Sequence, residues 1–229
     1  MHDPAAQHDW VVFDFGVTGL GASFHGDWVL YSGTALEHAL THLGGSDPEP
    51  DPERVLLLIE DVLRLRDSGL SGEDLSALWR ATGTPMDGQP EIGGREHAAL
   101  DRLLAMAVPL ARARGASRER VTTYPSCVPD GASPAAVEHR RRTADIVSLA
   151  GLLGREGPEG ADLRPAATRR AVVRCAETVC AELAFRFLLC AVGSFAVPLS
   201  PASYARLEEV AAAFGYGPHI VDAVEYLVA

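Results

Sequence analysis

The 229-residue chain has the composition of an ordinary globular protein with an acidic charge balance. Hydrophobic residues make up 47% and charged residues 22%, which excludes a disordered, collagen-like or disulfide-scaffold protein. All 20 basic residues are Arg, against 31 Asp and Glu, for a formal net charge of −11; because phosphate backbones require a basic footprint, nucleic acid is not an expected partner.

The negative charge is concentrated in one half of the chain. Residues 1–110 hold 18 acidic residues and 6 Arg, for a net −12, and the remainder is close to neutral. Such an asymmetry attracts basic partners and raises their association rate, although a solvated acidic surface that only aids solubility remains open. Lys and Asn, whose codons are AT-rich, are both absent, which indicates a high-GC gene.

The first predicted elements surround a glycine-rich segment. An apolar run over 10–15 is followed by three glycines at 16, 19 and 21, which argue against a helix interior and leave a short β-hairpin or an irregular segment open. Thr34 then predicts the start of a short helix that ends at Gly44, with Leu36, Leu40 and Leu43 as its buried face.

Three further helices are predicted before residue 115. The first begins at Pro52 and ends at Gly69, the second begins with a capping box at Ser71 and ends at Gly83, and the third covers about 95–114 with a kink at Pro109. Their buried stripes are predicted from helical spacing as Val55, Leu56, Ile59, Val62 and Leu63, then Leu75, Leu78 and Trp79, then Leu100, Leu103, Leu104 and Ala107.

The second half is predicted to be helical as well. Residues 115–135, with Pro125, Pro129 and Pro134, predict a linker or long loop, and helices are expected near 136–154, 165–196, 201–214 and 218–228. The predicted fold is therefore all-α, a multi-helix bundle divided into an acidic domain over 1–114, the linker, and a helical region of unassigned role over 136–229.

The apolar stretch 179–199 predicts a core helix. It contains Glu182 and Arg186, four residues apart, and charges of this kind are costly inside a bilayer. We therefore expect no membrane span, although such a helix could also form the interface of a homo-oligomer. The N-terminus shows no basic region followed by an apolar stretch, so the protein is expected in the cytoplasm.

Cysteine and histidine spacings do not predict a metal or disulfide framework. The cysteines, which form no Cys-x-x-Cys pair, are Cys127, Cys175, Cys180 and Cys190. They are expected to be reduced thiols. His38 and His42 are four apart on a predicted helix but lack further ligands, so no metal site is predicted. Ser126, Cys127 and His139 are candidates for nucleophilic catalysis that no recognisable motif surrounds.

One enzymatic alternative comes from Asp14-x-Gly16-x-Thr18, which follows an apolar run. The pattern looks like the first phosphate loop of the sugar-kinase and actin superfamily, in which an Asp faces metal and water while Gly and Thr approach phosphate. It would make the chain a nucleotide-dependent phosphotransfer enzyme. That superfamily needs further strands and a second nucleotide loop, which the helical pattern of this chain does not provide.

The segment 20–28 concentrates two aromatic residues, a His and an Asp. Phe24 and Trp28 are expected to pack against the neighbouring helices. Asp27 is expected to accept hydrogen bonds from a turn or helix start. With His25, these residues predict a structural corner.

The same segment, Leu-Gly-Ala-Ser-Phe-His-Gly-Asp-Trp, and the later Asp-Ser-Gly-Leu-Ser-Gly-Glu-Asp-Leu over 67–75 resemble the helical immunity proteins of bacterial contact-dependent growth inhibition systems. The resemblance covers about 10–105, and Phe-His-x-Asp-Trp is its most specific part. Ser23 replaces an aromatic residue and Gly72 an acidic one. Residues 120–229 have no counterpart.

The resemblance implies a small helical domain that binds and neutralises a cognate toxin domain, without catalysis or cofactor. Such toxins are often nucleases with a basic groove, for which an acidic binder would compete. The partner-binding surface is predicted at Asp47, Glu49, Asp51, Glu60, Asp61, Asp67, Glu73 and Asp74. A helical regulatory or scaffold protein is the remaining alternative.

Overall fold

The structure, a computed structural model, describes residues 15–24, 27–44, 52–83, 96–116, 134–154, 164–216 and 219–229. These residues form helices and no β-strand, which confirms the all-α prediction. The chain divides into two compact units, an N-terminal unit, Phe15–Val121, and a C-terminal unit that includes residues 122–229. The division falls inside the segment 115–135 that the sequence marks as a connection.

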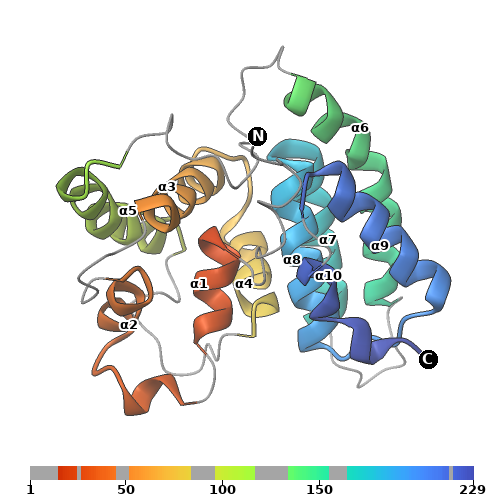
Figure 1. Ribbon diagram of the computed structural model, residues 1–229, viewed down its shortest axis with the longest axis horizontal. Helices are drawn as coiled ribbons and strands as arrows, with labels where there is room; N and C mark the ends of the chain where they lie inside the picture. Colours follow the sequence, from red (N-terminus) through yellow and green to blue (C-terminus); the bar gives the residue numbers. More distant parts are fainter. Residues whose placement is uncertain are drawn as a thin grey trace, which may run out of the picture. The chain divides into compact units, whose positions relative to one another are not determined.

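The N-terminal unit is built around α3 (Pro52–Arg66), which packs against α1 (Gly16–Ser23) and α5 (Glu96–Ala113). The 3-10 turn η2 (Trp28–Leu30), α2 (Ala35–His42) and α4 (Gly72–Ala81) complete it (Figure 1). Its largest fully buried side chains are Leu20, Phe24, Leu58 and Leu78. The predicted stripe of α5, Leu100, Leu103, Leu104 and Ala107, is buried as expected.

The glycine-rich segment is a helix, so the prediction of a hairpin or irregular segment is wrong for residues 16–23. The reason lies in its packing. A Cβ added at Gly21 would lie only 2.6 Å from Cβ of Thr82, at the end of α4. Glycine therefore permits a close approach that offsets its low helix propensity.

Two predicted helix starts are confirmed in atomic detail. The Thr34 hydroxyl accepts from the Glu37 backbone N–H at 3.1 Å, and the Glu37 carboxylate accepts from the Thr34 N–H at 3.1 Å. Ser71 and Asp74 form the same reciprocal capping box at α4. Each box satisfies two backbone donors that the first turn of a helix leaves unpaired.

The predicted buried faces of α2 and α3 are partly wrong. On α2 the buried residues are Ala35 and Ala39, followed by Leu43, whereas Leu36 and Leu40 are exposed. Small side chains face the neighbouring helices, so the leucines one position further along point to solvent. On α3 the buried apolar residues are Val55, Leu57, Leu58, Val62 and Leu65, and the predicted Leu56, Ile59 and Leu63 are half-buried.

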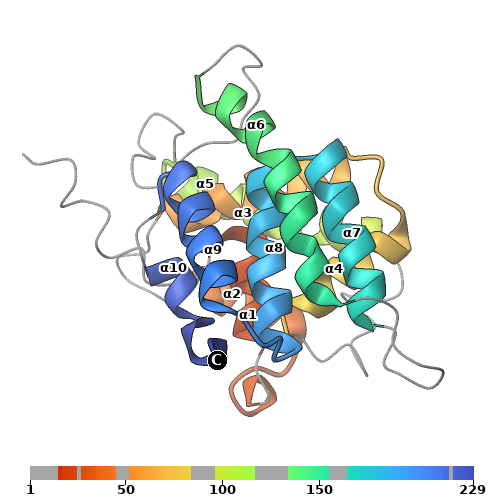
Figure 2. The ribbon, with the colours of Figure 1, turned by 90° about the vertical axis from the view of Figure 1, so that its right-hand side faces the viewer.

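The C-terminal unit is organised around α8 (Ala181–Ser194), whose residues from Ala181 to Leu189 are all buried. Helices α6 (Pro134–Leu149) and α7 (Arg164–Thr178) lie alongside it (Figure 2). The 3-10 turn η4 (Ala150–Leu153), α9 (Pro201–Ala213), α10 (His219–Asp222) and η5 (Glu225–Leu227) follow in the chain. Backbone hydrogen bonds of Leu199 with Leu227 and Ala229 hold the C-terminal end in place.

The single helix predicted over 165–196 is instead two helices, α7 and α8, which pack against each other. The chain turns at Val179 and Cys180, whose backbone N–H groups both donate to the Cys175 carbonyl at 2.9 Å. Folding back lets the apolar side chains of both helices share one core. No helix in the described part of the chain combines the length and apolarity needed to cross a bilayer.

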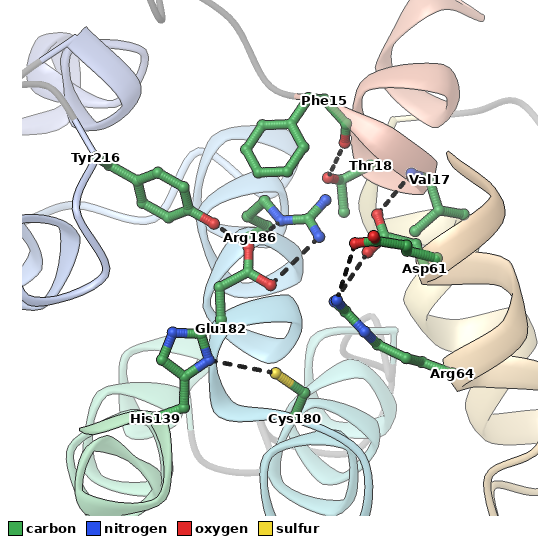
Figure 3. A network of polar contacts seen from close by, with 11 residues as sticks. Phe15, Val17, Thr18, Asp61, Arg64, His139, Cys180, Glu182, Arg186 and Tyr216 are labelled. Atoms are coloured by element: carbon green, nitrogen blue, oxygen red, sulfur yellow. Dashed lines mark hydrogen bonds and ion pairs between the residues drawn. The ribbon is translucent and has the colours of Figure 1, made fainter. Parts of the chain in front are cut away.

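The buried charges of α8 pair with each other and with Tyr216. Nε of Arg186 donates to the Glu182 carboxylate at 2.6 Å, and the Tyr216 hydroxyl donates to the same carboxylate (Figure 3). Both charged side chains are 1% exposed. Pairing removes most of the cost of burying the two charges, so this network is structural.

Candidate interaction surface

The N-terminal unit exposes a cluster of large apolar side chains within residues 29–40. Val29, Leu30 and Tyr31 lie in and just after η2, and Leu36 and Leu40 lie one turn apart on the outer face of α2. We call these five residues the apolar strip. Leu30 is 73% and Tyr31 80% exposed. Single exposed apolar residues are common, whereas large apolar patches often mark interaction sites, which makes this segment a candidate.

Aromatic packing holds the apolar strip in place. Phe24 and Trp28, both buried, meet edge to face with ring centroids 5.3 Å apart. The ring of His38 lies 4.6 Å from Phe24 and 5.6 Å from Trp28, and the ring of Trp79 lies 6.1 Å from Phe24. The predicted structural role of Phe24 and Trp28 is therefore correct.

The remaining residues of that predicted corner differ. Asp27 is exposed and makes no side-chain capping hydrogen bond to η2, so the prediction is wrong for this helix start, whereas a bond to a turn at 25–26 would lie outside the described residues; the Asp27 backbone carbonyl accepts from the Leu30 N–H at 2.9 Å. His25 lies outside the described residues.

Both ends of α2 are fixed as well. Beside the Thr34 capping box, the Arg114 guanidinium donates to the carbonyls of Leu43 and Gly44 at 2.7 and 2.6 Å. A cation at a helix C-terminus satisfies carbonyls that have no partner inside the helix and complements the helix dipole. The exposed face of α2 is thus presented by a rigid element.

The histidines of α2 are part of this packing. Nε2 of His38 lies 3.0 Å from the Ser23 carbonyl oxygen. Burial, followed by the nearby charges of Arg54 and His38, lowers the pKa of His42 to about 4. Within the residues the structure places, no group of three or more His, Cys, Asp or Glu side chains could hold a metal ion.

Two of the predicted partner-binding carboxylates are buried, and their assignment to the acidic surface is wrong. The Asp61 carboxylate is 2% exposed. It accepts hydrogen bonds from the Val17 N–H at 3.0 Å and from Arg64 at 3.3 Å (Figure 3). Asp74 accepts from the backbone N–H and the hydroxyl of Ser71. Both carboxylates serve helix N-termini, which favour negative charge.

The other predicted acidic residues have different surroundings. Glu60 is partly buried and pairs with Arg64 at 3.4 Å, whereas Glu73 is exposed. Asp67 is 63% exposed, and a hydrogen bond from Arg66 holds its pKa below the ordinary value. Asp47, Glu49 and Asp51 lie outside the described residues.

The geometry does not support the phosphate-loop alternative. Gly16 and Thr18 belong to α1, and the fully buried Thr18 hydroxyl donates to the Phe15 carbonyl at 3.0 Å. The N-terminus of α1, where a phosphate would bind, instead receives the carboxylate of Asp61. Asp14 lies outside the described residues.

The candidate nucleophiles are only partly described. Ser126 and Cys127 lie outside the described residues. His139 is buried, and its Nδ1 lies 3.9 Å from Sγ of Cys180, at the start of α8 (Figure 3). The ring of Phe214 packs edge-on against His139 at 4.9 Å. The described cysteines, Cys175, Cys180 and Cys190, form no disulfide.

Helical periodicity does not reveal the apolar strip, because it places the leucines of α2 in the core. One available signal was the run Trp-Val-Leu-Tyr over 28–31, four apolar residues in a turn too short to bury all of them. No family model, curated protein or solved structure matches the chain. The resemblance to immunity proteins therefore rests on the residues of its motifs alone.

Proposed function

We propose that this protein is a non-enzymatic binding protein of the immunity type, which neutralises a cognate, basic toxin domain. The apolar strip of the N-terminal unit is the observation that carries the proposal. The function needs no cofactor, because occupying a surface of the toxin is sufficient to block it.

The strip has the composition of the centre of a protein interface. Aromatic residues are enriched there and contribute much of the binding energy when they become buried, and Tyr31 is the most exposed large apolar residue described. The ring contacts among Phe24, Trp28 and His38 fix η2 and α2 in place. Little conformational entropy is therefore lost when the strip binds a partner.

Charge supports a basic partner. Asp27 and Glu37 are exposed next to members of the strip, and Asp67 and Glu73 add further exposed carboxylates to the same unit. With a net charge of −12 over residues 1–110, this unit would raise the rate at which a basic domain associates. The buried carboxylates of Asp61 and Asp74 do not take part in contact with the partner.

The experiment begins with capture of partners by the immobilised full-length protein from a lysate of its native organism, followed by mass spectrometry. The captured domain is then expressed alone to measure its toxicity, and co-expressed with the wild-type protein or with a Tyr31→Glu variant. We expect a basic, toxic domain that wild type neutralises and that Tyr31→Glu binds at least tenfold more weakly, since a charge at the centre of an interface is poorly tolerated.

Tyr226→Glu is the matched control, because Tyr226 is 71% exposed but belongs to η5 of the C-terminal unit. It should bind as wild type does. If Tyr31→Glu bound the partner as tightly as wild type, the strip would not be the binding surface. If the captured partner were not toxic, the immunity function would be refuted.

A further inference from the structure

The outer face of α7 forms a shallow hollow with an arginine-rich lining. The hollow has a volume of about 440 Å³ and is lined by Gly154 and by residues of α7 at helical spacing. Three of the lining residues are Arg169, Arg170 and Arg174. The feature lies wholly within the C-terminal unit, apart from everything used in the proposed function.

Two of these arginines have no partner among the residues that the structure describes. In the residues that the structure describes, Arg169 and Arg170 form neither an ion pair nor a side-chain hydrogen bond. Arg170 and Arg174 are four residues apart on one helix, so their like charges repel each other. Among the described lining residues, Glu177 is acidic. In the described lining, Arg169 and Arg170 therefore provide positive charge that a bound anion would neutralise.

We infer that this hollow is a binding site for a small molecule carrying phosphate groups. Guanidinium groups bind phosphate through paired, parallel hydrogen bonds, and adjacent arginines can engage more than one phosphate oxygen. Ala166 and Val173 contribute apolar surface between the charges. Small-molecule sites usually measure about 300–1,000 Å³, so the hollow has room for a ligand of this kind.

The dimensions favour a small ligand over a nucleic acid. A nucleic-acid backbone requires a basic surface that follows several successive phosphates, whereas the described part of this lining comes from one helix and Gly154. The net charge of −11 for the whole chain further opposes a long polyanion.

The test is calorimetric titration of the full-length protein with inorganic pyrophosphate, in the absence of divalent cations, at low and moderate NaCl. We expect saturable binding with one site, weakened by salt because the interaction is between exposed charges. The double variant Arg169→Gln/Arg170→Gln should weaken the affinity at least tenfold, since it removes two charge-assisted contacts.

Arg140→Gln/Arg141→Gln is the matched control, because it removes an adjacent, exposed pair from α6 of the same unit and lowers the net charge equally. This control should bind pyrophosphate as wild type does. Circular dichroism of both variants should match wild type, so that a loss of affinity is not a loss of fold. The inference is overturned if wild type shows no saturable binding, or if the two double variants lose affinity equally.

Discussion

Replacement of Asp61 by Ala tests the assignment of this carboxylate to the core of the N-terminal unit. The carboxylate accepts from the Val17 N–H at 3.0 Å and from Nη1 of Arg64 at 3.3 Å, and the side chain is 2% exposed. The substitution leaves a backbone donor at the start of α1 unpaired and deprives Arg64 of one acceptor. Arg64 keeps its second partner, Glu60.

The expected loss of stability follows from these contacts. A buried hydrogen bond to a charged group contributes about 1.5–3 kcal/mol, and a carboxylate at a helix N-terminus adds about 0.5–1 kcal/mol. We therefore expect Asp61→Ala to lower the free energy of unfolding by about 3 kcal/mol. Asp67→Ala, one and a half turns further along, should leave it unchanged within error because Asp67 is exposed.

The measurement is urea unfolding followed by tryptophan fluorescence. The chain has three Trp, and in a Trp10→Phe background the remaining Trp28 and Trp79 both report on the N-terminal unit. Asp61→Ala should lower the urea midpoint without changing the slope. Equal midpoints for Asp61→Ala and Asp67→Ala would refute the assignment and restore Asp61 to the accessible acidic surface.

Further predictions concern both units. Gly21→Ala should destabilise the N-terminal unit by about 1–3 kcal/mol in the same assay, because the added Cβ would overlap Thr82; a gain in stability, as helix propensity alone predicts, would contradict the close approach. Tyr216→Phe should lower the stability of the C-terminal unit by about 1.5–3 kcal/mol, because it removes a buried donor to Glu182. Circular dichroism during unfolding measures this loss. The pKa of His42 is about 4 in the folded protein and 6.5 in the reference state, so the unfolded chain binds the extra proton first. Stability should therefore fall as pH falls from about 6.5 to about 4, and His42→Gln should reduce that dependence.

Local signals determined where most helices lie and how they begin. Thr34 with Glu37 and Ser71 with Asp74 lie three residues apart, so the sequence alone predicts each capping box. The apolar residues that recur at helical spacing from Leu100 also lie on the buried face of α5, as their spacing predicts. Interactions within one helical turn depend only on near neighbours in sequence.

The acidic surface, the apolar strip and the helix at the glycine-rich segment depended on tertiary structure. Asp61 is buried because α1, 44 residues earlier in the chain, directs its Val17 N–H at the carboxylate. Gly21 is helical because Thr82 approaches it closely, and Leu36 is exposed because α2 packs through its alanines. Hydrophobic periodicity identifies a helix, but the neighbour that a helix packs against determines which of its faces is buried, and that neighbour is distant in sequence.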